Sequence, residues 1–212
     1  MANTNFTIGT IGFSRILFGI YADNAETVTD VVTIDETNGG AIELKTSGFQ
    51  GQLNTTYASN IAYYISDAGT GTGKVEITAL ELSKDVATKV LGDKEENGIL
   101  ATYSNVTQPY VSVIAEAEDL QGKKMWIGIA KAKFGTPDGD ELKTSEDKGK
   151  TPNNITLSGS AITRRSDKLV KCKASETSGA TFTAFATKMF PGFSDIAKFD
   201  RTTTTVSDGG AG

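Results

Sequence analysis

The chain has no histidine, and Cys172 is its only cysteine. The absence of histidine excludes Ser/His/Asp and Cys/His nucleophilic sites, HExxH metal helices and imidazole acid–base catalysis. A single cysteine excludes a disulfide within the chain, which suits a reducing compartment or a cysteine-poor particle. These absences remove most familiar enzyme classes, so we expect no catalysis, no metal and no cofactor.

Proline and long apolar runs are also scarce. The 212 residues include only 4 prolines, and no apolar run approaches the ~20 residues that a membrane-spanning helix needs. The N-terminal residues show no signal sequence, so we expect no membrane partner. The net charge of −5 and the pI near 4.9 are opposite to the basic footprint of a DNA-binding protein, which makes sequence-specific nucleic-acid binding unexpected.

What the chain does contain favours β-structure. It has 23 glycines, and many threonines, valines and isoleucines, a mixture typical of strands joined by turns. At ~150 residues per domain, the length predicts one large domain. Apolar and polar residues alternate in segments that we expect to pair as antiparallel hairpins: 6–21 with 27–34, 61–66 with 74–82, 109–119 with 124–134, and 154–163 with 168–175, with a further strand at 42–46.

Two short helices are expected among these strands. Ser83 is a hydroxyl N-cap and Gly92 a stop signal for a helix between them. The four-residue spacing of Leu82, Val86 and Val90 predicts that this helix docks on the sheet through these side chains. A second helix, at 182–189, has an apolar stripe and is followed by Pro191, which cannot continue a helix.

Polar segments interrupt the β pattern in three places. We expect a β domain over residues 1–199, with extended loops at about 47–60 and 135–152, and a flexible C-terminal tail at 200–212. Phe49, Leu53 and Tyr57 recur every four residues, so a helical turn is an alternative for the first loop.

Four motifs suggest chemistry but have simpler interpretations. The glycine-rich run at 68–74 resembles a phosphate-binding loop, but a strand pattern follows it where a helix is required. The acids at 138–141 lack the spacing of a calcium loop, and Cys172 without histidine is best interpreted as a small buried hydrophobe. Glu116 and Glu118 have a spacing near that of glycosidase carboxylates, but the aromatic platforms of a sugar site are missing around them.

Several blocks of the sequence together resemble a known family. In order and spacing, the chain is similar to the major tail (tail tube) proteins of long-tailed bacteriophages that infect Gram-positive bacteria. The blocks that carry the resemblance are Tyr57–Tyr64, Gly73–Ile77, Leu82–Val86, Val90–Asp93, Glu96–Leu100 and Ala184–Pro191.

The resemblance implies both a fold and a function. The fold is an antiparallel β-sandwich or half-barrel with one flanking α-helix and a short C-terminal helix. The function is that of a structural virion protein, assembled in the host cytoplasm, whose six-membered rings stack into the tail tube through which DNA passes without specific binding. Tape-measure, tail-terminator and distal-tail or baseplate proteins are the implied partners. An extracellular adhesive or carbohydrate-binding β-module is the alternative.

Within such a tube, two groups of residues become candidate sites. Glu116 and Glu118 alternate with apolar residues along their strand, so we expect them to face away from the core and to line the lumen with negative charge. The second loop is the candidate ring contact, through its charged residues Asp138, Asp140, Lys143, Lys148 and Lys150.

Overall fold

The computed structural model describes residues 9–51, 53–67, 69–139, 144 and 152–201. Twelve strands, two α-helices and two 3₁₀ helices lie in these ranges, so the predicted mainly β fold class is confirmed. The strands are β1 (Thr10–Tyr21), β2 (Val28–Ile34), β3 (Ala41–Ser47), β4 (Leu53–Ala58), β5 (Ile61–Asp67), β6 (Gly73–Ala79), β7 (Lys94–Glu96), β8 (Ile99–Ala101), β9 (Val111–Asp119), β10 (Lys124–Phe134), β11 (Ile155–Ala161) and β12 (Lys171–Ser175).

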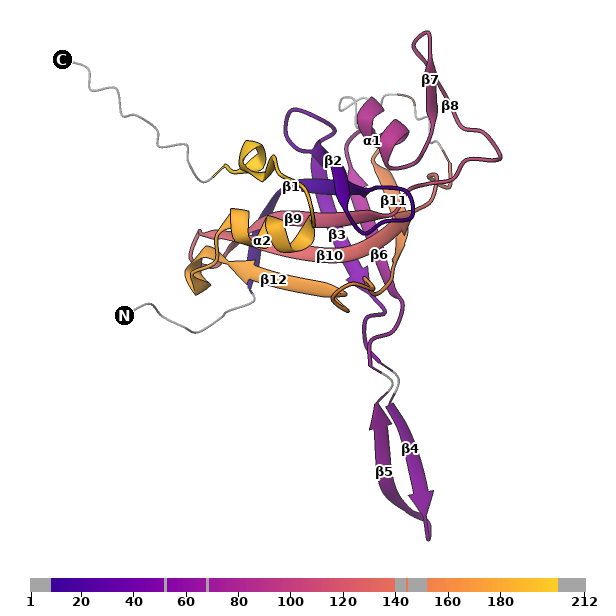
Figure 1. The fold of residues 1–212 in the computed structure, drawn as a ribbon, viewed down its shortest axis with the longest axis vertical. Coiled ribbons are helices and arrows are strands. Elements are labelled where there is room, and N and C mark those ends of the chain that lie inside the picture. Colours follow the sequence, from indigo (N-terminus) through magenta and orange to yellow (C-terminus); the bar gives the residue numbers. More distant parts are fainter. Residues whose placement is uncertain (1–8, 52, 68, 140–143, 145–151, 202–212) are drawn as a thin grey trace, which may run out of the picture.

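Eight of the strands form one curled antiparallel sheet. Its order is β2-β1-β9-β10-β11-β6-β3, and β12 pairs with β10 outside this path. The sheet bends until β3, at one end of the order, approaches β1, which gives a half-barrel (Figure 1). The hairpins β1–β2 and β9–β10 pair as the sequence predicts.

Two predicted pairings are wrong. β5 pairs with β4 and not with β6, whose partners are β3 and β11. β11 and β12 do not pair with each other, because both lie along β10: β12 against Met125–Ile129 and β11 against Ala132–Phe134. β10 has 11 residues, so one long strand supplies an edge for two short ones.

The sheet buries apolar side chains on both faces. Its inner face encloses a core in which Phe18 and Phe134 meet edge to face. The outer face of β1, β9 and β10 carries a second apolar cluster, which includes Trp126. Helix α2 (Phe182–Met189) and the 3₁₀ helix η2 (Ile196–Phe199) cover this second cluster (Figure 1).

The two helices begin at hydroxyl caps. The Ser83 side chain accepts a hydrogen bond from the backbone N–H of Val86 and starts α1 (Lys84–Lys89), and Thr181 does the same for α2. Helix α1 closes one end of the inner core, whereas α2 lies on the outer face. None of the described helices is long and apolar enough to cross a bilayer.

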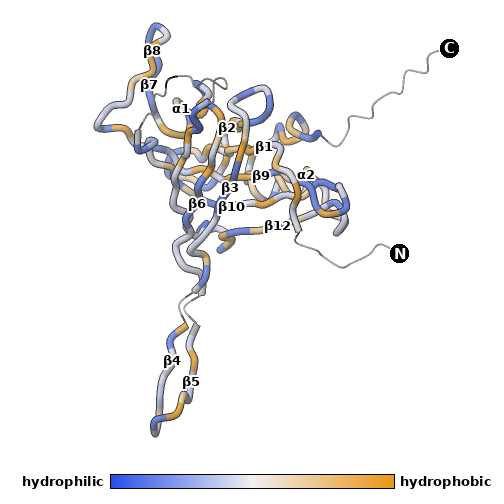
Figure 2. The backbone as a smooth tube through the Cα atoms, turned by 180° about the vertical axis from the view of Figure 1, so that it is seen from behind, coloured by the Kyte–Doolittle hydropathy of each residue, from blue (hydrophilic) through white to orange (hydrophobic). Residues whose placement is uncertain are grey.

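Two small hairpins project from opposite ends of the half-barrel. β4 and β5 form a long arm on one side, and β7 and β8 form a shorter one on the other (Figure 1). The alternative of a helical turn near Tyr57 is wrong, because Leu53–Ala58 in the first arm is a strand. Orange hydrophobic segments on this arm lie away from any core in Figure 2.

Candidate assembly and channel surfaces

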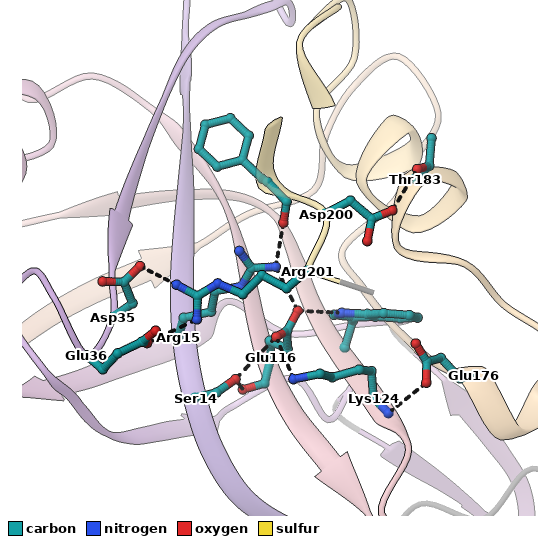
Figure 3. A network of polar contacts seen from close by, with 12 residues as sticks. Ser14, Arg15, Asp35, Glu36, Glu116, Lys124, Glu176, Thr183, Asp200 and Arg201 are labelled. Atoms are coloured by element: carbon teal, nitrogen blue, oxygen red, sulfur yellow. Dashed lines mark hydrogen bonds and ion pairs between the residues drawn. The ribbon is translucent and has the colours of Figure 1, made fainter. Parts of the chain in front are cut away.

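Glu116 lies in a buried polar cluster on the outer face of the sheet. Its side chain is only 2% exposed. Oε2 accepts hydrogen bonds from Arg15 Nη2 at 2.9 Å and Trp126 Nε1 at 3.1 Å, and Oε1 is 3.2 Å from Lys124 Nζ (Figure 3). The prediction that Glu116 lines a lumen is therefore wrong, because the face opposite the inner core is itself covered by α2 and η2.

The partners of Glu116 stabilise its ionised form. Burial by itself raises the pKa of a carboxylate, but the hydrogen bonds and charge of Arg15, the Trp126 indole and the charge of Lys124 outweigh it, so the pKa of Glu116 is lowered. Arg15 also donates from Nη2 to the carbonyl of Phe199 at 2.6 Å. The cluster therefore ties β1 and β9 to the C-terminal segment.

Two further ion pairs fix the same C-terminal segment. Arg201 contacts Asp35 at 2.7 Å and Glu36 at 3.0 Å, and both acids belong to the turn after β2 (Figure 3). Neither Arg15 nor Arg201 was predicted as a site residue from the sequence. A signal for the covered face was present, because Ile114 breaks the apolar–polar alternation of β9 on the side that carries Glu116.

The other predicted lumen acid is in a different environment. Glu118 is exposed, near the end of β9, and its role in a lumen stays a prediction.

The predicted docking stripe of α1 lies against the inner core. Val86 and Val90 are fully buried there, and Leu82 is partly buried and packs against it. These three side chains support the subunit itself.

The candidate contact loop is only partly described. Asp138 is exposed. Asp140, Lys143, Lys148 and Lys150 lie outside the described residues, so their role in a ring contact stays a prediction.

The β4–β5 arm carries large apolar side chains that are exposed and not buried in a core. Six of them are at least 60% exposed: Leu53, Tyr57, Ile61, Tyr63, Tyr64 and Ile65. The register places Tyr64 opposite Thr56 and Ile65 opposite Thr55, so successive pairs put apolar groups on both faces of the ribbon. An isolated two-stranded hairpin is marginal in water, so this arm has the character of a surface that is covered by a partner.

A broad polar surface covers the outer side of the other half of the sheet. We call it the polar face. Its side chains alternate with residues of the inner core along each strand, and they come from β3, β6, β11 and the end of β10: Glu43, Lys45, Ser47, Lys74, Glu76, Thr78, Lys133, Thr156, Ser158 and Ser160. The alternation of residues 74–79 was the sequence signal for it.

Register organises the polar face into rows. Lys133, Ser160 and Lys74 are neighbours across three strands, and Ser158, Glu76 and Lys45 form the next row. Lys45 pairs with Glu43 at 2.9 Å. Between Lys74, Glu76 and Lys133, the small residues of β11 leave a shallow groove of about 380 Å³. Opposite charges and hydroxyls are thus interleaved on this face.

The remaining motifs show no reactive geometry. Cys172 Sγ lies 3.3 Å from Met189 Sδ, and burial raises its pKa to about 11, so the thiol is mostly protonated at neutral pH. The residues after the glycine-rich turn enter strand β6 and not a helix. Within the described ranges, no group of three Asp, Glu or Cys side chains is placed to hold a metal ion.

A mainly β half-barrel with a projecting arm that exposes large apolar side chains is typical of a protein that binds partners through its surfaces. The model of the phage tail tube protein family matches residues 12–198. The chain therefore belongs to the phage tail tube protein family, and it is a structural component of the virion whose family self-assembles into a tube. No curated protein matches the chain.

Proposed function

We propose that six copies of this chain close into a ring, and that the rings stack into the tube through which phage DNA leaves the capsid. Closed cyclic symmetry requires two different patches on each copy that meet around the ring. The two ends of the sheet order, β2 and β3, provide such patches, because an edge strand can pair with a strand of a neighbour.

The observation that carries the proposal is the β4–β5 arm. It projects along the long axis of the molecule, away from the half-barrel, and exposes large apolar groups on both faces (Figure 1). A surface of this kind is stable when it is inserted between partners, and the family assembles from copies of itself. We assign the arm to the contact between successive rings.

Replacing the arm tests this assignment. A variant with Leu53–Asp67 exchanged for a short Gly/Ser turn is expected to fold with an unchanged melting temperature and to form no tubes in electron micrographs. Leu120→Ser, which removes one exposed apolar side chain from the β9–β10 turn, is the control and should assemble normally. Tubes of normal length and yield without the arm would contradict the assignment.

The predicted loop contact is tested separately. Deleting residues 138–150 should leave a folded subunit with impaired polymerisation. Native-length tubes in normal yield would move the contact to the β4–β5 arm alone.

A further inference from the structure

We infer that the polar face forms the wall of the channel, and that the strand face that carries the buried Glu116 does not. This inference rests on the proposed function, because it assumes that the chain forms a tube. It assigns one face of the sheet to the passage of a polyanion and the opposite side, with α2, to the exterior.

A channel wall must let phosphates pass without holding them, so it needs hydroxyls and compensated charges instead of a lysine-rich or apolar surface. The polar face carries five serines and threonines, three lysines and two glutamates. Glu76 lies opposite Lys45 across the strands and two residues from Lys74 along β6, so both of these lysines have a negative neighbour, whereas the row neighbours of Lys133 are Ser160 and Lys74.

The polar face has no large apolar side chain of its own among the described residues. None of the ten side chains of the polar face is apolar, and among the described residues the exposed Tyr110 and Ile162 lie beside Lys133 at the margin of this face. A face without apolar anchors is a poor candidate for a protein–protein contact, since contact cores are rich in aromatic and aliphatic groups. It suits permanent exposure to water.

The polar face extends to β3, the last strand in the sheet order, so pairing at that edge would continue the same surface into the next copy. Helix α2 cannot form such a wall. It has 8 residues and is about 12 Å long, and it lies over the middle of the sheet.

Thiol labelling of assembled tubes tests the inference. Ser158→Cys places a thiol at the centre of the polar face, and Thr187→Cys places one on the exposed side of α2. The probes are a small maleimide and a maleimide coupled to a globular protein wider than the channel. The native chain gives the background, because burial keeps Cys172 mostly protonated.

In assembled tubes, Ser158→Cys should react with the small maleimide, but its labelling by the protein conjugate should fall to the background level of the native chain. Dissociating the tubes should restore labelling by the conjugate. Thr187→Cys should react with both probes throughout. Conjugate labelling of Ser158→Cys in intact tubes, or protection from both probes, would overturn the inference. Reaction of Thr187→Cys in tubes with the small maleimide but not with the conjugate would also overturn it, because that pattern would place α2 in the channel.

Assembly separates the two proposals. If the native chain forms no tubes, the proposed function fails. If native tubes form but Ser158→Cys does not assemble, Thr156→Cys on the same strand face replaces it, and failure of both variants would show that the face is a subunit contact and would overturn the inference.

Discussion

The two halves of the curled sheet use charge in opposite ways. On the half under α2, Arg15 and Glu116 are almost completely buried and pair at 2.9 Å. On the polar face, Lys45 and Glu43 pair at the same distance, but their side chains are 64% and 47% exposed. The distance is equal and the energetic role differs, because water screens the exposed pair and not the buried one.

The comparison teaches how one sheet can serve both folding and assembly. Where a helix covers the outer face, a buried charge is paired with an opposite charge, and Arg15 also binds the segment that covers it. Where the outer face is bare, charges contribute little to folding and remain free to define the surface that a passing molecule meets. The effect of changing a side chain should therefore depend on whether its position is buried or exposed.

Removing the buried acid should have the largest effect. Glu116→Ala leaves Arg15 buried without its carboxylate, and breaking one partner of a buried ion pair costs about 3–5 kcal/mol. We expect insoluble or unfolded subunits in a chemical denaturation series. Glu118→Ala, two residues along the same strand but exposed, should denature like the native chain. Equal stability of the two variants would contradict the proposed difference between the covered half and the exposed half of the sheet.

A charge placed in the inner core should be similarly damaging. Val90 is fully buried where α1 closes the half-barrel, so Val90→Asp buries an unpaired carboxylate at a cost of several kcal/mol. The expected result is loss of soluble protein in expression trials. Soluble, folded protein that fails only to assemble would show that α1 faces a partner.

Acid should lower the stability of the subunit through Asp119, a buried carboxylate at the end of β9. Asp119 accepts hydrogen bonds from the hydroxyls of Ser175 and Thr177 at 2.6 Å, and these bonds, with backbone N–H donors of the β9–β10 turn, lower its pKa from 3.8 to about 2. A lowered pKa stabilises the fold above the unfolded value and loses that contribution as pH falls through the folded value. Stability should therefore fall between about pH 4 and about pH 2.

The variant Asp119→Asn should reduce this acid dependence in melting curves recorded across that range. The dependence will not vanish, because Glu26 and Asp167 also have pKa values lowered to about 2. Asp138→Asn, in the exposed loop, is the matched control and should follow the native curve. An identical pH dependence for Asp119→Asn and the native chain would show that the titration of this carboxylate does not contribute to the loss of stability in acid.

The fold class and most strands follow from the sequence, because alternation and turn residues are local signals. Pairing is not local. Residues 61–66 and 74–82 are adjacent strands in the sequence, and adjacent strands usually pair, yet β6 finds its partners in β3 and β11 and leaves β5 to the projecting arm. Only the closed inner core, with Val75, Ile77 and Leu157 inside it, decides between these arrangements.

The lumen assignment shows a similar limit. Alternation separates the two faces of β9, but it does not reveal whether a distant helix covers the second face. Ile114 and Trp126 on that face were the available signals, and neither specifies that α2, some 60 residues later, is what packs there. The helix stripe of Val86 and Val90 was predictable because one local spacing is sufficient to define it.

The smallest effect on folding should come from the polar face, and it gives the sharpest test of its role. Glu43→Lys with Glu76→Lys leaves the face with lysines alone as charged groups, yet exposed charges contribute only about 0–1 kcal/mol each, so subunits should fold and tubes should form. In phage carrying this double variant, DNA release should slow at low ionic strength, because the wall now attracts phosphates, and should recover as salt is raised and the screening length shrinks. Glu81→Lys with Glu96→Lys reverses two exposed acids outside the polar face and is the matched control. If both double variants release DNA at the native rate at low salt, the polar face does not meet the DNA; if both slow it equally, overall charge and not the channel wall is responsible.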